Sequence, residues 1–370
     1  MDVFLNDLLT EELELFSHSQ ALDPIAPLPC DRWVALSALQ KSIRRGDSVT
    51  AQRALRTLYR HDPSSTWRRL LIIACEDVGI GALGAVIVTA RRCANAKAFR
   101  ERGSEEPAAL ATAQMLAEAP KDRSADLLFA VALHDPALKT MRSRCRSVSM
   151  ARRLEFVADP TLSLPERALA AWYSSGVESR GDQRVGPGDV DALTRTYAEL
   201  GVPAQLLEAT AVAVKKAREP LVLLLPLLWQ AAAGSKTELL ESPLTPSSLI
   251  NGVPLYALDR HTRLGRQAIR LFSRESAEIT QFLTERGHSS GDDGALRMAV
   301  FYADGAPTWP TLQWRHSAEL RATGAAADFR SVNVEAEVGA ELVQLVAAHI
   351  ADLNKLRRQM LSRALPADRP

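Results

Sequence analysis

Apolar side chains recur at three- and four-residue steps along most of the chain, the spacing that places them on one face of a helix. The pattern is clearest over residues 33–59, whose apolar positions include Trp33, Leu36, Leu39, Ile43, Ala54, Leu55 and Leu58. Gly46 and Asp47 interrupt this stretch. We therefore expect two helices here, the second capped at its N-terminus by Asp47 or Ser48.

The helical spacing continues beyond this pair. The turn signal HDPSST at 61–66 precedes a helix expected over 67–77, which Gly79 ends. Further helices are expected over 82–97, 105–118, 124–133, 165–175, 188–200, 204–217, 219–232, 263–285, 294–302 and 335–363. Alternating strand patterns are nearly absent, and the short exceptions lie at 85–88 and 253–256. The sequence predicts an all-α, multi-helix fold.

Charge is distributed unevenly along the 370 residues. The formal net charge is −6 over residues 1–40, +10 over 41–153 and −3 over 154–370. This asymmetry indicates a basic module with acidic flanks, and the length favours two or three domains. A loop-like stretch at 181–188 marks the expected boundary between two helical domains, so we expect the chain to have three parts. These are an acidic N-terminal helix in residues 1–32, a basic helical domain over 33–180 and a second helical domain of unknown type over 181–370.

Composition narrows the class of protein further. Hydrophobic residues make up 46% and charged residues 24%, as in ordinary globular proteins. No run of about 18 uncharged apolar residues occurs, and the first residues are acidic where a signal peptide needs basic ones. The four cysteines form no CxxC pair, which suits reduced thiols. We expect a cytoplasmic protein without a membrane span.

Two His-Asp pairs resemble metal-binding dyads at first sight. His61-Asp62 and His134-Asp135 are each followed by proline. Asp before Pro is typical of a turn and a helix start, because Asp accepts backbone N–H bonds and Pro suits the first helical turn. We therefore expect no metal site.

The most informative block lies between Lys41 and Gly79. Glu76 and Asp77 fall at the C-terminal end of a predicted helix, where the helix dipole disfavours negative charge. They therefore need cationic partners. We expect an internal ion-pair network that orients three helices, although a catalytic role for the carboxylates stays open. The candidate cations are Arg44, Arg45, Arg68 and Arg69.

This block resembles the C-terminal helical region of the RarA/MgsA replication-associated recombination ATPases, relatives of the clamp loaders. The resemblance is carried by Lys41–Asp47 (KSIRRGD), Arg68–Leu70 (RRL), Cys75–Gly79 (CEDVG) and Ala119–Asp122 (APKD). The segments keep the family's order and similar spacing over roughly residues 35–135, although Cys75 and Asp122-Arg123 depart from its pattern. The resemblance implies a clamp-loader-collar-like fold for the N-terminal region, homo-oligomerisation and association with replicating DNA or a partner ATPase.

The nucleotide-binding half of that family has no counterpart here. No GxxxxGK[ST] phosphate-binding loop occurs in the 370 residues. The resemblance therefore does not imply ATP hydrolysis, and we expect no cofactor. Residues 154–370 lie outside the part that resembles the family.

An arginine-rich stretch over residues 141–153 contains no acidic residue. Guanidinium groups bind phosphates through paired hydrogen bonds, so a cluster of them favours contact with the nucleic-acid backbone, independent of base sequence. The alternative is a solvated loop whose arginines pair with the acidic flanks. The predicted nucleic-acid-binding residues are Arg44, Arg45, Arg142, Arg144, Arg146, Arg152 and Arg153.

A second polar cluster lies within residues 251–270. Asp259, His261, Arg263 and Arg266 separate an apolar segment from a predicted helix. They can form a pocket in which His261 and the arginines hold an anionic group. Alternatively, Asp259 or Thr262 caps the following helix and His261 packs on its flank.

Three functions follow from these observations. The first is a non-enzymatic protein of DNA replication or repair that oligomerises and contacts nucleic-acid backbone or a partner ATPase. The second is an enzyme with a polar site at Glu76 and Asp77 or at Asp259 and His261. The third is a protein-interaction adaptor that binds no nucleic acid.

Overall fold

The computed structural model describes residues 25–179, 185–242, 244, 247–288 and 294–364. Over these residues the fold is all-α, as the apolar spacing predicts, with a few short strands. The α-helices are α2 (Arg32–Arg44), α3 (Ser48–His61), α4 (Pro63–Ile73), α5 (Leu83–Ala94), α6 (Ala96–Glu101), α7 (Glu105–Glu118), α8 (Ser124–His134), α9 (Lys139–Ser147), α10 (Met150–Ala158), α11 (Leu164–Ser175), α12 (Val190–Glu199), α13 (Ala204–Ala217), α14 (Leu225–Ala232), α15 (Arg263–Glu275), α16 (Ala277–Glu285), α17 (Gly294–Val300), α18 (Ser317–Arg330), α19 (Ala336–Ala348) and α20 (Ile350–Ala364).

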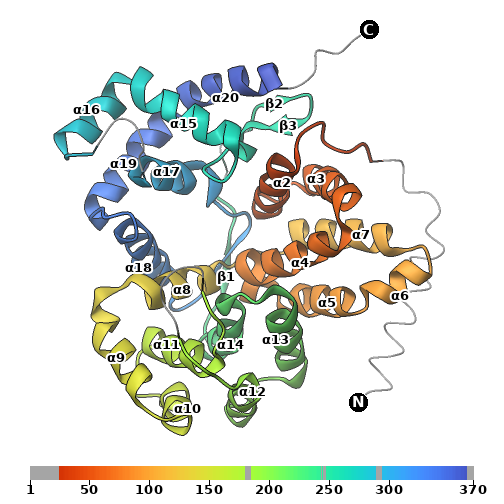
Figure 1. The fold of residues 1–370 in the computed structure, drawn as a ribbon, viewed down its shortest axis with the longest axis vertical. Helices are drawn as coiled ribbons and strands as arrows, with labels where there is room; N and C mark the ends of the chain where they lie inside the picture. Colours follow the sequence, from red (N-terminus) through yellow and green to blue (C-terminus); the bar gives the residue numbers. More distant parts are fainter. Residues whose placement is uncertain (1–24, 180–184, 243, 245–246, 289–293, 365–370) are drawn as a thin grey trace.

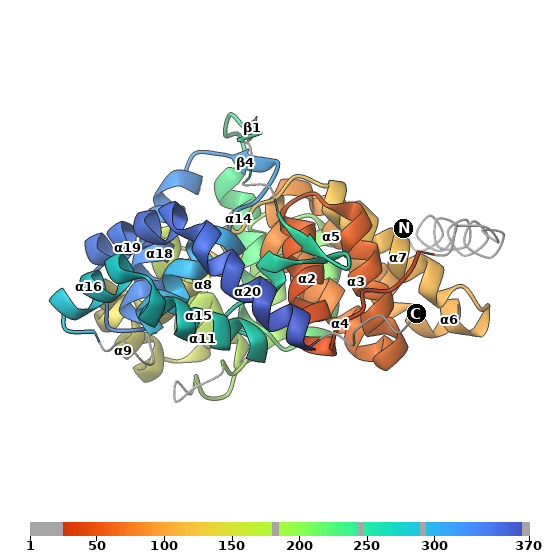
Figure 2. The ribbon, with the colours of Figure 1, turned by 90° about the horizontal axis from the view of Figure 1, so that it is seen from above.

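Short helical turns and strands connect these helices. The π-helical turns are η1 (Ala74–Val78) and η6 (Phe301–Gly305), and the 3-10 turns are η2 (Gly79–Ala82), η3 (Pro136–Leu138), η4 (Pro220–Leu224) and η5 (Leu255–Ala257). Strand β1 (Glu238–Leu240) pairs antiparallel with β4 (Thr311–Gln313), and β2 (Leu249–Ile250) pairs antiparallel with β3 (Val253–Pro254). Figure 2 shows the β1–β4 pair projecting from the helical body.

Local capping explains where many helices begin. The Asp47 side chain accepts a hydrogen bond from the Thr50 N–H at the start of α3, which confirms the predicted N-cap. Asp62 accepts bonds from the N–H groups of Ser64 and Ser65, with Pro63 at the first position of α4. Asp135 likewise accepts from the Ala137 N–H. Both His-Asp pairs are therefore turn and helix-start signals.

Several predicted boundaries differ from the structure. The helix expected over 263–285 is divided at Ser276, and the helix expected over 335–363 is divided at His349. Helix α18 was not predicted, and the arginine-rich stretch 141–153 forms α9 and α10 rather than a loop. Residues 1–24 of the predicted acidic helix lie outside the described residues, and residues 25–31 are not helical.

The chain runs around a central region in three groups of helices. Figure 1 shows α2 to α7 on one side, α8 to α14 below and α15 to α20 above and opposite. Helix α18 packs against α8, and α15 packs against α20. The buried apolar side chains form one cluster from Leu28 to Leu361. This core runs across the predicted boundary at 181–188, so the packing gives no support to separate domains and the division stays a prediction.

Gly79 allows the segments Cys75–Gly79 and Ala119–Asp122 to pack against each other. Its φ is +50°, and a Cβ atom there would lie 2.5 Å from the carbonyl oxygen of Asp122. Because glycine has no Cβ atom, the backbone of 121–122 can lie against the end of η1. The Asp122 N–H donates to the carbonyl oxygens of Asp77 and Val78, at 3.1 Å each.

One stretch, Pro63–Ala94, is long and apolar enough to cross a membrane by length and composition. In the structure it is not one straight helix but α4, η1, η2 and α5 in succession. Trp67, Leu70 and Ile73 from this stretch are at most 2% exposed and belong to the protein core. The structure is therefore compatible with a soluble protein.

Candidate functional site: a charged cleft

A cleft of about 430 Å³ lies where the three groups of helices meet. Its walls come from α2, α4, η1, the start of α8, the loop before α15, η6 and α18. We call it the charged cleft, because nine charged side chains line it. The cations are Lys41, Arg44, Arg69, Arg123 and Arg260, and the carboxylates are Glu76, Asp126, Asp259 and Asp328.

Asp77 lies directly behind this cleft and is fully buried. The Arg44 Nε lies 2.5 Å from its Oδ1, and the Arg123 Nε lies 3.2 Å from the same atom. The Gln40 amide donates to its Oδ2 at 2.9 Å. A buried carboxylate is tolerated when cations and hydrogen bonds satisfy it in this way. The predicted ion pair between Asp77 and an arginine is confirmed.

Glu76 faces the cleft beside Asp77. Its Oε1 accepts from the Arg44 Nη2 at 2.9 Å and from the Gln40 Nε2 at 2.8 Å. Burial, together with the negative charges of Asp77 and Asp126, raises the pKa of Glu76 to about 7. This value places the titration of Glu76 close to neutral pH.

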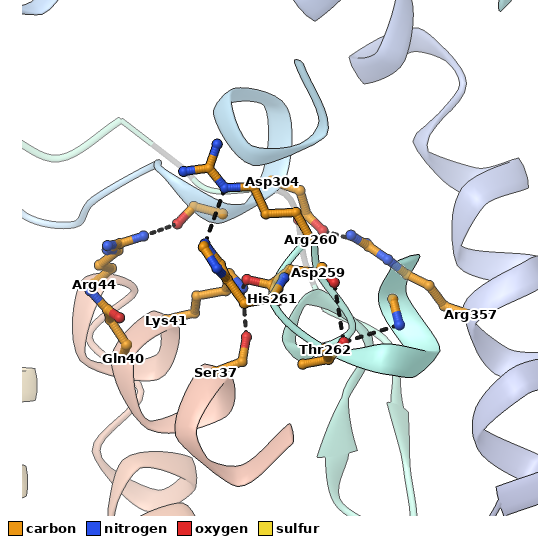
Figure 3. A network of polar contacts seen from close by, with 12 residues as sticks. Ser37, Gln40, Lys41, Arg44, Asp259, Arg260, His261, Thr262, Asp304 and Arg357 are labelled. Carbon is orange, nitrogen blue, oxygen red and sulfur yellow. Dashed lines mark hydrogen bonds and ion pairs between the residues drawn. The ribbon is translucent and has the colours of Figure 1, made fainter. Parts of the chain in front are cut away.

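Lys41 joins α2 to the loop before α15. Its ammonium group donates to the Asp259 carboxylate and, at 2.7 Å, to the Ser37 hydroxyl (Figure 3). Burial lowers the pKa of Lys41 to about 8 although Asp259 favours its charged form. Burial alone would raise the pKa of Asp259, but the charges of Lys41 and His261, with their hydrogen bonds, lower it to about 2.

A second buried cluster fixes the opposite wall. The Asp304 carboxylate pairs with the Arg357 Nη1 at 2.5 Å and with the Arg45 Nη2 at 2.9 Å. The Arg44 Nη1 donates to the Gly305 carbonyl at 2.8 Å. Figure 3 shows α2, η6 and α20 held together by these contacts. Arg44 and Arg45 therefore hold the walls of the cleft in position.

Two guanidinium groups in the cleft form no ion pair with a described residue. Arg69 donates one bond, at 2.9 Å, to the side-chain amide oxygen of Gln40, and its Nε is buried without a partner among the described residues. Arg260 donates to the His261 Nε2 at 3.1 Å and to the Met298 sulfur at 2.9 Å, and it lies over the Phe301 ring. Burial lowers the pKa of Arg260, although Asp328 and Asp259 favour the charged form.

His261 lies beside Arg260 on the same wall (Figure 3). Desolvation lowers the pKa of His261 to about 4. The positive charges of Arg260, Lys41 and Arg69 also lower it, while the negative charge of Asp259 raises it. With this lowered pKa the His261 imidazole is neutral near pH 7, so the positive charge on this wall comes from the neighbouring cations.

The other residues of the predicted pocket and network lie elsewhere. Arg263 and Arg266 are exposed on α15 and do not line the cleft, while Thr262 caps that helix by accepting from the Gly265 N–H. Arg68 is exposed and donates to the Ala217 carbonyl at 2.8 Å. It therefore stands outside the network around Asp77.

The predicted nucleic-acid-binding arginines fall into a buried group and a more exposed group in the structure. Arg44 and Arg45 are turned inward and paired with carboxylates, and their contact with a nucleic-acid backbone stays a prediction. Arg153 is also buried, and it donates to the carbonyls of Cys145 and Tyr173.

Four of the predicted arginines remain on α9 and α10. Arg142 is half-buried and donates to the carbonyls of Ala132 and Asp135. Arg144, Arg146 and Arg152 are exposed, and Arg152 pairs with Glu155. Together these three form the exposed basic surface of this part of the chain.

Several residues of the cleft and of the buried cluster around Asp304 were not singled out from the sequence. Arg123 appeared only as a departure from a family segment, and Arg260 only as a neighbour of Asp259. Asp304, Asp328 and Arg357 carry no local signal, because they act on residues far away in the sequence. Among the described residues, no group of three His, Cys, Asp or Glu side chains is arranged to hold a metal ion.

No protein-family model, curated protein or solved structure matches the chain. The resemblance to the RarA/MgsA family stays a prediction.

Proposed function

We propose that the protein is a binding protein whose charged cleft holds an anionic, phosphate-bearing ligand. The observation that carries the proposal is the pair of guanidinium groups, Arg69 and Arg260, that share the cleft without a carboxylate partner among the described residues. Arginine is the side chain best suited to phosphate, because its planar donors match phosphate oxygens and its charge is permanent.

The pairing of the remaining charges supports the same conclusion. Glu76 is paired with Arg44, Asp126 with Arg123 and Asp259 with Lys41, while Asp328 accepts from the Tyr302 hydroxyl. These pairs leave Arg69 and Arg260 as the two cations of the cleft outside an ion pair with a described residue. A partly buried cation without a counterion is costly, and a bound anion removes that cost.

Titration calorimetry with pyrophosphate at low salt tests this proposal. Arg69→Ala and Arg260→Ala should each weaken binding by about tenfold or more, because each removes a charge-assisted hydrogen bond. The matched controls are Arg68→Ala and Arg263→Ala, which remove neighbouring exposed arginines outside the cleft. Absence of pyrophosphate binding, or equal losses in the controls, contradicts the proposal.

Three of the four residues considered for an enzyme line the cleft, and the fourth, Asp77, lies behind it. Glu76 lines it in front of Asp77, and Asp259 lines it beside His261. All three carboxylates pair with a basic side chain, and the pKa of His261 is lowered to about 4. We favour binding over catalysis, because Lys41, Glu76 and Asp259 are each engaged in an ion pair within the cleft.

A second proposal concerns DNA. We propose that the exposed arginines of α9 and α10 contact nucleic-acid backbone, with the family resemblance as further support. Arg144 and Arg152 both lie over the Phe156 ring, at 4.6 and 4.8 Å from its centre. This stacking orders two guanidinium groups on the surface. A cytoplasmic location, self-association and a partner ATPase belong to the same proposal, and the four free thiols support the location.

A further inference from the structure

An exposed tryptophan stands beside the charged cleft. Trp33 lies in the first turn of α2 and forms part of the cleft lining. Its side chain is 56% exposed, although a tryptophan ring gains more than most side chains from leaving water. The Asp31 carboxylate accepts from its backbone N–H at 2.8 Å, which fixes the helix start that carries the ring.

The ring is held by a neighbouring cation. The Arg32 guanidinium carbon lies 4.9 Å from the Trp33 ring centre, within the range of a cation–π contact. Leu36, one turn further along α2, also lines the cleft and adds apolar surface beside the ring. An ordered, exposed aromatic ring next to arginines is the arrangement that proteins use to stack bases of single nucleotides or single strands.

The ring and the charged groups share one face of α2. Trp33, Ser37, Gln40, Lys41 and Arg44 recur at helical spacing and all line the cleft. Gln40, which bonds Arg69, lies seven positions after Trp33, so the two residues are roughly 10 Å apart along the helix. A ligand that reaches both needs a flat group joined to an anionic group by a spacer. A nucleotide has this form, with its base, sugar and phosphates.

We propose that the charged cleft binds a nucleotide, with the base on Trp33 and the phosphates at Arg69 and Arg260. This inference rests on the anion site proposed above and specifies its ligand. The cleft volume of about 430 Å³ lies within the range of small-molecule sites. Because every base has a π face, stacking alone predicts little preference among the bases. The ligand is a free nucleotide or the terminal nucleotide of a single strand.

The test compares pyrophosphate with nucleoside 5′-diphosphates that carry the same two phosphates. In titration calorimetry on the full chain, ADP and UDP should bind more tightly than pyrophosphate. Trp33→Ala should weaken both nucleotides by about tenfold, the size expected when a base loses its stacking partner. It should leave pyrophosphate affinity unchanged, and Trp33→Phe should recover part of the nucleotide affinity.

Val49→Ala is the matched control. Val49 occupies the same position in α3 that Trp33 occupies in α2, is 65% exposed and does not line the cleft. This variant should bind both ligands as the unchanged protein does. Thermal unfolding of each variant shows whether the start of its helix is intact. A 5′-phosphorylated thymidine oligomer that binds more tightly than the mononucleotide identifies the end of a strand as the ligand, and equal affinity identifies the free nucleotide.

The outcomes separate this inference from the proposal on which it rests. If no phosphate compound binds, the anion site itself fails. If pyrophosphate binds and depends on Arg69 and Arg260, but nucleotides bind no more tightly, the anion site stands and base stacking is overturned. Equal weakening of pyrophosphate and nucleotides in Trp33→Ala also overturns it.

Discussion

At the scale of single residues, the protein is organised around one buried carboxylate. Asp77 has no exposed surface, and Arg44, Arg123 and Gln40 all reach it. Gln40 also bonds Glu76 and accepts from Arg69, so one side chain links the buried network to the cleft. Substitutions here change both stability and the charges that a ligand meets.

Asp77→Ala should lower the free energy of unfolding by about 3–5 kcal/mol, because it removes the buried counterion that Arg44 and Arg123 share. Denaturant unfolding followed by circular dichroism measures this loss. Glu208→Ala is the control, since Glu208 is exposed in the middle of α13, and should change stability by at most about 0.5 kcal/mol. A loss for Asp77→Ala no larger than that of the control would show that the network contributes little.

Glu76 should make stability depend on pH near neutrality. Its pKa is raised from 4.5 to about 7, so the folded protein binds more protons than the unfolded chain between these values. This contribution to stability is complete below about pH 4.5 and is lost as pH rises through about 7. Unfolding free energies measured from pH 4 to 8 should fall less steeply with pH in Glu76→Gln. An identical slope in both proteins is the contrary result.

At the scale of helices, the face on which an arginine lies decides whether its guanidinium group is exposed for contact with a nucleic acid. The stretch 141–153 forms two amphipathic helices, which turn Arg153 inward and leave Arg144, Arg146 and Arg152 exposed. Arg142 is occupied by the carbonyls of Ala132 and Asp135. A test of nucleic-acid binding therefore needs the three exposed side chains.

Replacing Arg144, Arg146 and Arg152 with alanine should reduce DNA binding at low salt. The slope of log affinity against log salt should become shallower by up to about three units, because each lost phosphate contact releases about one counterion fewer. Fluorescence anisotropy with duplex DNA at a series of salt concentrations measures this slope. Replacing Arg263, Arg266 and Arg270, which are exposed on α15, gives a variant of equal charge that should keep the slope. The proposal is refuted if the unchanged protein does not bind DNA, or if the unchanged protein and both triple variants give the same slope.

At the scale of the whole molecule, the three groups of helices are joined by buried polar contacts as well as by the apolar core. Lys41 of α2 reaches Asp259 before α15, and Arg357 of α20 reaches Asp304 in η6. Helix α18 packs on α8 and adds Asp328 to the cleft. The cleft therefore exists only when all three groups are assembled.

The family resemblance predicts that this assembled chain associates with itself. Static light scattering should give two or four times the chain mass of 40.4 kDa at micromolar concentrations. Arg144→Ala and the other surface variants of α9 and α10 should leave this mass unchanged if oligomerisation and DNA contact use different surfaces. A mass of one chain across the whole concentration range contradicts the assembly.

The sequence by itself determined the helical class, many helix starts and the need of Asp77 for a cation. These features depend on spacing and hydrogen bonds within a few residues, as Asp47 and Asp62 show when they cap α3 and α4. Only the tertiary structure decided which cation meets which carboxylate. The pairs Lys41–Asp259 and Arg45–Asp304 join positions more than 200 residues apart, and every arginine carries the same charge in the sequence. The carboxylates that the fold places beside Arg44, Arg45 and Arg123 then separate these arginines from Arg69 and Arg260.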